Sequence, residues 1–302
     1  MKPSPASQAT PRAPRRSALS SDLAELIKAR IALMVVITTA AGFLLASPWA
    51  IDLRLFLATL VGTALVASGA GVLNQVLEAK IDERMERTAD RPIPGGRIGV
   101  DLALTLGILL SVTGLLQLAW MVNLLTAVLG AATLAGYIFV YTPMKRWTSL
   151  STIVGAVPGA VPPMMGWTAA RNSLDAGAWG LFAILFLWQM PHFLAIAWMY
   201  RDDYRRGGFP MLPVIDPDGE RTARQAVLYG AALVPTSLLP TVLGLTGTTY
   251  FVGAMLLSVI YLACSFSFQQ ERSRHRARRL LLASVIYLPA LLAIMFADRY
   301  FI

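Results

Sequence analysis

The sequence has few charged residues and few side chains that bind metals through sulfur or imidazole. Only 14% of its 302 residues are charged, against roughly 25% in a typical soluble domain, and 56% are hydrophobic. There are two histidines and a single cysteine, Cys264, which lies in an apolar segment. One cysteine excludes a disulfide-stabilised scaffold. The scarcity of charge excludes a soluble globular enzyme and a disordered chain.

The segments without charge are long enough to cross a membrane. They cover residues 31–51, 55–77, 102–144, 147–170, 176–200, 225–270 and 280–297. A transmembrane helix needs about 20 apolar residues, so the two longest segments each supply two crossings and the total is nine. The segments are continuously apolar, whereas strands of a membrane β-barrel alternate in polarity, so each crossing is expected to be a helix.

The sequence therefore predicts an all-α membrane protein. A disordered cytosolic arm is expected over residues 1–21 and a single transmembrane domain over 22–302. The expected helices cover about residues 24–47, 53–77, 98–119, 121–141, 148–169, 176–200, 225–246, 248–269 and 279–298.

The basic residues are distributed unequally between the two faces of this bundle. Nine crossings place 23 of the 26 Lys and Arg residues on one face. The positive-inside rule assigns that face to the cytoplasm, with the N-terminus inside and the C-terminus outside. The net charge of +9 is therefore a signal of topology, and no nucleic-acid partner is expected.

Ten of the 17 acidic residues lie in or beside two loops on this face. Asn74, Glu78 and Asp82 are spaced four apart, so they share one side of a helix if it continues that far. Such oxygen donors suit Mg²⁺, which commonly takes one or two carboxylates together with substrate phosphates. The alternative is a solvated helix end neutralised by Lys80 and Arg84. Against it, acids at a helix C-terminus oppose the helix dipole, and Asn74 lies a turn deeper, where an unpaired amide is costly.

Basic residues on the same face complete a candidate site for a polyanion with an apolar tail. They are Lys28, Arg30, Arg87, Arg91, Lys145 and Arg146. Guanidinium and ammonium groups would share the phosphate charge with a metal, while the tail lies among the helices. For Lys145 and Arg146, simple anchoring on the inner face is the alternative.

The second loop and the helix before it contain further candidates. Asp202 and Asp203 follow the sixth helix, and together with the first acidic motif they suggest a second metal-binding pair. His192 lies within that helix beside Pro191, and ionisable residues inside a membrane are functional candidates. A neutral histidine satisfied by a neighbouring helix is the equal alternative.

Several stretches resemble the UbiA superfamily of intramembrane prenyltransferases and, within it, the branch that modifies haem. The matching stretches span about residues 28–225 and are Lys28 to Arg30, Asn74 to Pro92, Tyr141 to Thr148, Gly155 to Trp167 and Trp188 to Pro213. The sequence Trp-Gln-Met-Pro-His-Phe at 188–193, followed by Asp-Asp-Tyr and Pro-Met-Leu-Pro, is typical of the haem-modifying branch, whereas the Asn74 motif is shared more widely.

This resemblance implies a UbiA-type bundle in a bacterial inner membrane, with the active site facing the cytoplasm. It implies that the farnesyl group of farnesyl diphosphate is transferred to a vinyl group of haem b, with addition of water, to give haem O and diphosphate. Mg²⁺ is the implied cofactor. The implied partners are the two substrates, the lipid bilayer and a downstream enzyme that forms haem A.

The resemblance also implies roles for individual residues. The residues implied to bind the metal are Asn74, Glu78, Asp82, Asp202 and Asp203. The residues implied to be catalytic are these five together with Tyr141 and Lys145. Substrate binding falls on Lys28, Arg30, Arg87, Arg91, Arg146 and His192, the last as an axial ligand or hydrogen-bond donor to haem. Two positions depart from the family pattern, because Glu78 replaces a frequent Asp and Ser151 a usual Asn. Which of Asp202 and Asp203 would touch the metal stays open.

Two other functions are compatible with parts of the sequence. A UbiA-type prenyltransferase for a quinone or chlorin precursor would share the acidic motifs but should lack the Trp-Gln-Met-Pro-His segment. A transporter would place its charges near the middle of the membrane, whereas here they lie at one face.

Overall fold

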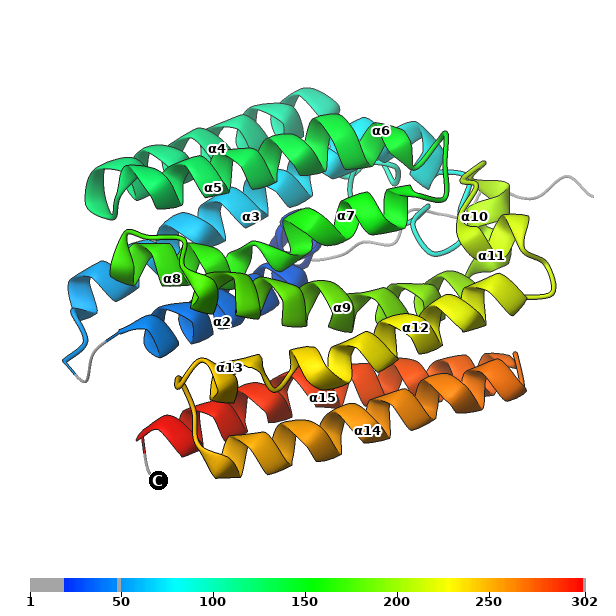
Figure 1. Ribbon diagram of the computed structural model, residues 1–302. Helices are drawn as coiled ribbons and strands as arrows, with labels where there is room; N and C mark the ends of the chain where they lie inside the picture. The colour runs from blue at the N-terminus through cyan, green and yellow to red at the C-terminus, as the bar shows by residue number, and fades with distance from the viewer. Residues whose placement is uncertain (1–18, 48–49, 301–302) are drawn as a thin grey trace, which may run out of the picture.

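The computed structural model describes residues 19–47 and 50–300 and is helical throughout, apart from its turns and loops. The helices of the first half are α1 (Leu19–Leu26), α2 (Ala29–Ala46), α3 (Leu53–Asp82), α4 (Val100–Met121), α5 (Leu124–Ala135), the π-helix η1 (Gly136–Tyr141), α6 (Thr142–Met144), α7 (Ser151–Ala160) and α8 (Pro162–Arg171). Those of the second half are α9 (Ala176–Met199), α10 (Arg201–Arg206), α11 (Leu212–Ile215), α12 (Glu220–Thr236), α13 (Leu239–Val242), α14 (Thr248–Gln270) and α15 (Arg274–Tyr300). The long helices lie side by side in one bundle (Figure 1).

Eight helical segments within the described residues are long and apolar enough to cross a membrane. They are Ala29–Ala46, Leu53–Asp82, Val100–Met121, Leu124–Met144, Ala176–Met199, Glu220–Val242, Thr248–Gln270 and Arg274–Arg299. The remaining predicted crossing, residues 148–169, corresponds to α7 and α8, two helices of ten residues each that are interrupted at Val161. Pro162 and Pro163 follow that residue and have no amide hydrogen for a continuous helix, which accounts for the interruption.

The N-terminal prediction is only partly within the described residues. Of the expected arm over residues 1–21, residues 1–18 lie outside the described residues. Residues 19–21 are helical and form the start of α1. The first expected helix, 24–47, is divided between α1 and α2, with Ile27 and Lys28 in the turn between them. α3 instead continues without a break to Asp82, beyond the predicted end at residue 77.

The π-helix η1 carries Tyr137 and Tyr141. It precedes Pro143, which cannot donate the usual helical hydrogen bond. The Thr142 hydroxyl donates to the carbonyl of Tyr137 at 2.8 Å. The rings of Tyr137 and Tyr141, four residues apart in this segment, lie next to each other, with centroids 5.3 Å apart. Single π-helical turns of this kind frequently occur at functional sites.

Glycine permits very close packing of α2 against α8. A Cβ atom on Gly42 would lie 1.9 Å from the carbonyl oxygen of Pro163, and one on Gly166 would lie 1.9 Å from that of Thr39. No other residue fits at either position without separating the helices. Small residues commonly play this part where transmembrane helices meet.

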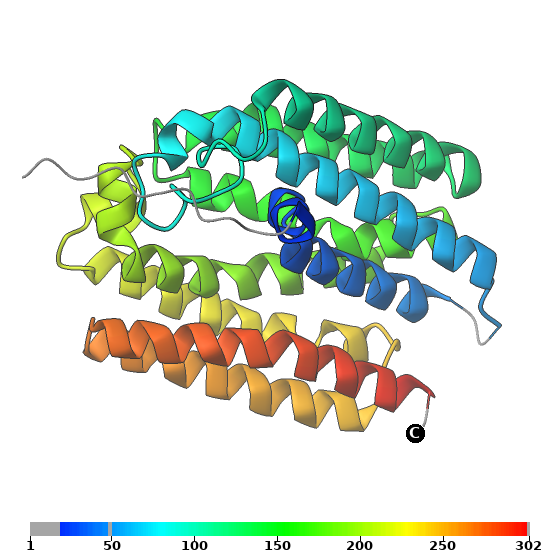
Figure 2. The ribbon, with the colours of Figure 1, turned by 180° about the vertical axis from the view of Figure 1, so that it is seen from behind.

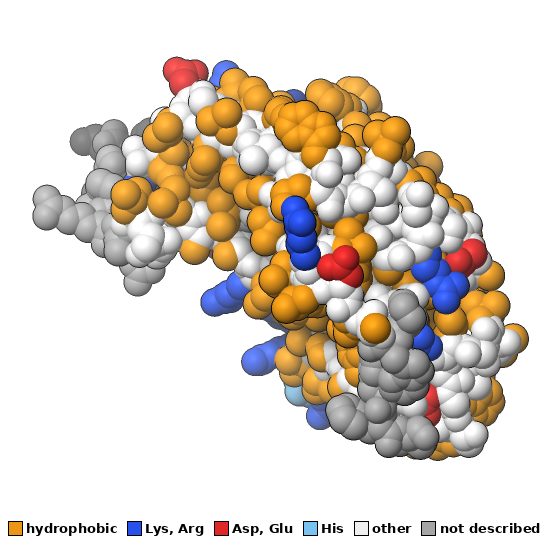
Figure 3. All heavy atoms as spheres, turned by 90° about the vertical axis from the view of Figure 1, so that its left-hand side faces the viewer, with side chains coloured by type: hydrophobic (Ala, Val, Ile, Leu, Met, Phe, Trp, Pro, Cys, Tyr) orange, Lys and Arg blue, Asp and Glu red, His pale blue; other side chains and the backbone are white. Residues whose placement is uncertain are grey.

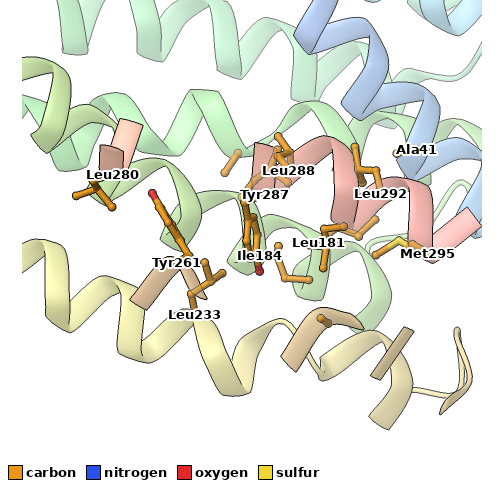
Figure 4. Packing of buried hydrophobic residues seen from close by; sticks show 14 of the residues in the cluster. Ala41, Leu181, Ile184, Leu233, Tyr261, Leu280, Tyr287, Leu288, Leu292 and Met295 are labelled. Atoms are coloured by element: carbon orange, nitrogen blue, oxygen red, sulfur yellow. The ribbon is translucent and has the colours of Figure 1, made fainter. Parts of the chain in front are cut away.

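The largest packed core joins α2, α8 and α9 to the C-terminal helices α12, α14 and α15. Figure 4 shows Ile184 of α9 beside Tyr287 of α15, and Tyr261 of α14 beside Leu233 of α12, all within this core. In a membrane, lipid is as apolar as these side chains, so close packing and hydrogen bonds hold such helices together. Accordingly, the buried tyrosines keep polar partners: the Tyr261 hydroxyl donates to the Trp188 carbonyl at 3.0 Å.

The two ends of the bundle differ. At one end, the loop between α3 and α4 lies beside α10 and α11, as both ribbon views show (Figures 1 and 2). Met85 from that loop packs against Phe209 and Met211, which precede α11. The surface seen from the other end, where α13 lies, has many hydrophobic side chains with charged ones scattered among them (Figure 3). The first acidic motif ends at Asp82, where the loop between α3 and α4 begins, and the second lies in α10. Both motifs therefore belong to the end of the bundle that carries α10 and α11.

Candidate functional site

The first acidic motif lies on one continuous helix, as its spacing predicted. Asn74, Glu78 and Asp82 all belong to α3, and their exposed fractions are 1%, 5% and 1%. They are therefore not solvated residues at a helix end. Two carboxylates with so little exposure require compensating charge, because burying an unpaired charge is very costly.

The compensating charges come from other parts of the chain. Lys145, just after α6, forms an ion pair with Glu78, and Arg91, in the loop after α3, pairs with Asp82 at 2.6 Å. Neither observed partner is Lys80 or Arg84, the residues that would neutralise the acids in the solvated alternative. Burial alone would lower the pKa of Lys145, but Tyr141 and the Glu78 carboxylate raise it above its usual value. The two acids thus lie in a charge-compensated cluster.

Lys28 reaches the same cluster from the turn between α1 and α2. Its Nζ atom donates to Oδ1 of Asn74 at 2.5 Å and lies 3.5 Å from the Tyr137 hydroxyl. The Asn74 amide nitrogen donates to the Thr142 hydroxyl at 3.1 Å, so both ends of this buried amide have partners. Burial, followed by the nearby charge of Arg91, lowers the pKa of Lys28 from 10.5 to about 7.

Aromatic rings border the cluster. Lys145 Nζ lies 4.8 Å from the centroid of the Tyr141 ring and 5.7 Å from that of Phe209. Arg87 lies over Tyr200 and Tyr204, at 5.3 and 5.8 Å from the ring centroids. Aromatic faces attract cations, so these rings help to hold the basic side chains and could also stabilise a substrate cation.

The two residues of the second acidic motif have different surroundings. Asp203 is 8% exposed, accepts the backbone N–H of Glu86 at 3.1 Å and pairs with Arg206. This contact joins α10 to the loop that follows the first motif. Asp202 is exposed and pairs with Arg205 at 2.9 Å. The structure thus brings Asp203, rather than Asp202, into contact with the first loop.

Two further predicted basic residues, within the part of the chain that the structure describes, form no ion pair with the buried acids. Arg146 donates to the Leu77 carbonyl at 3.2 Å, and Arg30 is exposed on α2. Three further polar residues of the cluster were not predicted from the sequence: Tyr137, Thr142 and Thr88, whose hydroxyl donates to the Asp82 carbonyl at 2.9 Å. For Tyr137, the available signal was its spacing of four residues from Tyr141.

His192 occupies a different part of the molecule. It lies on α9 against α15, where its Nδ1 atom is 2.7 Å from the Ser284 hydroxyl. Its ring stacks on Trp188 with centroids 5.4 Å apart. Trp188 in turn donates to the Ser284 carbonyl at 2.9 Å. The histidine therefore has a satisfied interhelical contact, and the described contacts do not join it to the acidic cluster.

The oxygen donors of the cluster fit a hard divalent cation. Glu78 and Asp82 supply two buried carboxylates on one helix face, and Asn74 an amide oxygen. Within residues 19–47 and 50–300, no three Asp, Glu, His or Cys side chains converge into a complete metal site. Two carboxylates completed by phosphate oxygens and water are, however, a usual environment for Mg²⁺.

Comparisons with known proteins give one consistent result. The UbiA prenyltransferase family matches residues 35–288. A protoheme IX farnesyltransferase of Solibacter usitatus is 49% identical over 287 residues, which cover 92% of this chain and 98% of that protein. The solved structure of a digeranylgeranylglyceryl phosphate synthase superposes with a TM-score of 0.78 at 17% identity, covering 93% and 98% of the two chains. A UbiA homologue of Archaeoglobus fulgidus bound to GPP and Mg²⁺ superposes with a TM-score of 0.65 at 14% identity, covering 91% and 99%.

Proposed function

Because the chain belongs to the UbiA prenyltransferase family, we propose that it transfers the farnesyl group of farnesyl diphosphate to a vinyl group of haem b. Addition of water would complete haem O, and diphosphate would be released. The observation that carries this proposal is the buried cluster at the end of α3, where two carboxylates lie among Lys28, Arg91 and Lys145. The name of the 49% identical relative supports the choice of substrates.

The basic residues of the cluster would bind the diphosphate. Lys28, Arg91 and Lys145 are closest to the buried acids, while Arg87, Arg146 and Arg30 would act from its edge. Mg²⁺ would be held by Asn74, Glu78 and Asp82, with Asp203 rather than the exposed Asp202 contributing from the second motif, and would neutralise the diphosphate charge. A homologue bound to GPP and Mg²⁺ supports this cofactor.

The chemistry follows from the departure of the diphosphate. The bond between farnesyl C1 and the diphosphate oxygen breaks, and its electron pair leaves with the diphosphate, which the ammonium and guanidinium groups stabilise. The terminal carbon of the haem vinyl group forms a bond to C1. Water then adds to the adjacent carbon and loses a proton, giving the hydroxyethylfarnesyl group. The rings of Tyr137 and Tyr141 would stabilise the allylic cation and keep water away.

His192 is proposed to contact the haem. Because Nδ1 already faces Ser284, Nε2 is the nitrogen left for iron or for a hydrogen bond. Replacement of His192 by Ala should change the absorption spectrum of bound haem b, while replacement of the exposed His275 should not. An unchanged spectrum for His192→Ala would remove the axial-ligand role.

We also propose the finer topology. Residues 22–302 would form one domain with nine crossings, in which α7 and α8 together make one interrupted crossing. The concentration of basic residues supports a cytoplasmic active site in the inner membrane, with the N-terminus inside and the C-terminus outside. A Cys264→Ser protein with one new cysteine at Asp218 or at Ser173 provides the test. An impermeant thiol reagent should label the second in intact cells and the first only after lysis.

Mass spectrometry of extracted haem tests the reaction. The protein is expressed in a bacterial strain that lacks haem O, with an Asp82→Asn variant at the same level as the control. Haem O should appear with the unsubstituted protein and not with the variant. Haem b alone, or a prenylated quinone in its place, would overturn the proposal. A downstream haem A-forming enzyme, the proposed partner, would consume the product.

A further inference from the structure

The turn between α1 and α2 has an uncommon backbone conformation. Lys28 lies in the left-handed region, with φ 51° and ψ 50°, and among the described non-glycine residues only Asn172 also has positive φ. Asparagine adopts this conformation readily, whereas lysine does so at a cost in energy. The surrounding structure must therefore hold Lys28 in place.

Gln75 of α3 contacts the chain just before this turn. Its side chain is fully buried, and its Nε2 atom donates to the carbonyls of Glu25 and Leu26, each at 2.9 Å. These carbonyls belong to the last turn of α1, where a helix leaves carbonyls without the usual helical donors; that of Glu25 also accepts the backbone N–H of Lys28 at 3.1 Å. The two hydrogen bonds let α1 end at this point inside the protein.

Gly71, one turn earlier on α3, contacts the turn itself. A Cβ atom at this position would lie 3.2 Å from the Ile27 carbonyl oxygen and 3.5 Å from Cβ of Lys28. The side of α3 that carries Gly71 and Gln75 thus sets where α1 ends and how closely the turn between α1 and α2 approaches α3. Asn74, beside Gln75 on the same helix, accepts the hydrogen bond from Lys28.

We infer that Gln75 is a positioning residue for Lys28: by binding the end of α1 it directs the Lys28 ammonium group into the diphosphate site. A right-handed helical residue has φ near −63°, so continuing α1 through residue 28 would redirect this side chain. Gln75 itself need not touch the substrate. The inference rests on the proposed function, because it assigns Lys28 to binding of the prenyl diphosphate.

The test measures binding of farnesyl thiolodiphosphate, an unreactive analogue, to the full-length purified protein in Mg²⁺. Gln75→Met removes the two hydrogen bonds with little change in side-chain length, and we expect Kd to rise about tenfold. In a Lys28→Met background the same substitution should change Kd less than about twofold, because Gln75 would affect binding only through the position of the Lys28 ammonium group, which is then missing. Gln117→Met is the matched control, since Gln117 also donates to a backbone carbonyl, that of Ala58, but lies away from the cluster.

Two results would overturn the inference. One is an unchanged Kd for Gln75→Met, and the other is a full additional loss of affinity in the Lys28→Met background, as a general packing defect would cause. If Gln75→Met does not yield folded protein, Gly71→Ala tests the same junction, and an unchanged Kd there would count equally against it. The analogue requires no haem, so absence of haem O formation with intact, Lys28-dependent analogue binding would contradict the proposed reaction alone.

Discussion

Lys145 and Glu78 form a buried ion pair between the residue that follows α6 and the last part of α3. The exposed fractions of the two side chains are 11% and 6%. Because the ammonium group also lies against the Tyr141 ring, it connects the acidic motif with the aromatic border of the site. The carboxylate thus has a counterion supplied by the protein itself.

Removal of this counterion should lower both stability and activity. Lys145→Met leaves Glu78 buried without its partner, and we expect the free energy of unfolding to fall by about 3 kcal/mol. Thermal unfolding in detergent measures this change. Lys80→Met, at an exposed position of the same helix, should have little effect. In a Lys145→Met/Glu78→Gln double variant, stability should return while prenyl transfer stays low. A double variant that loses as much stability as Lys145→Met alone would contradict the pairing.

Asp82 should be required for turnover. Asp82→Asn keeps the shape of the side chain but removes the charge that faces Arg91 at 2.6 Å and that would help to bind the metal. We expect the turnover number, with farnesyl diphosphate, haem b and Mg²⁺, to fall by about 10²-fold or more. Asp101→Asn, an exposed acid at the start of α4, is the control and should retain activity. Turnover near that of the unsubstituted protein would reject the metal assignment.

Removal of divalent cations should abolish activity without unfolding the protein. The carboxylates of Glu78 and Asp82 already have basic partners, so a chelator should leave the helical circular dichroism signal unchanged. Adding Mg²⁺ should restore prenyl transfer, and Ca²⁺ should restore it less well, because its coordination is larger and less regular. Prenyl transfer that persists in excess chelator would rule out a metal-dependent reaction.

Asp298 should matter for stability but not for catalysis. Its carboxylate accepts the backbone N–H groups of Gly247 and Tyr250 at the start of α14, far along the chain from α15. Asp298→Ala leaves both donors unpaired, and that of Tyr250 is buried, so we expect the free energy of unfolding to fall by about 2 kcal/mol, measured as a lower Tm, with turnover unchanged below the transition. The matched control is Asp52→Ala, which removes an exposed cap of α3 and should cost less. Equal changes in Tm for the two variants would show that burial of the cap is unimportant.

Part of this site could be read from the sequence because it depends on neighbours along one helix. The four-residue spacing of Asn74, Glu78 and Asp82 predicted a shared face, and the continuous α3 confirms it. The cost of an unpaired buried amide argued against a solvated helix end, and the structure agrees, because Asn74 is buried and bonded to Lys28 and Thr142. The identity of these partners was not predicted, since it depends on the turn after α1 and on the π-helix.

Local hydrophobicity by itself determined the helical bundle, and residue position determined the concentration of acidic residues near two loops; the prenyltransferase family was indicated by the resemblance of particular stretches, such as residues 188–213. These properties follow from short stretches of chain, where a helix places every fourth side chain on one side. Only the tertiary structure decided that Lys145 pairs with Glu78, that Arg91 pairs with Asp82, and that Asp203 rather than Asp202 contacts the first loop. Long basic side chains have several acidic neighbours within reach along the sequence, and helix packing and burial select among them.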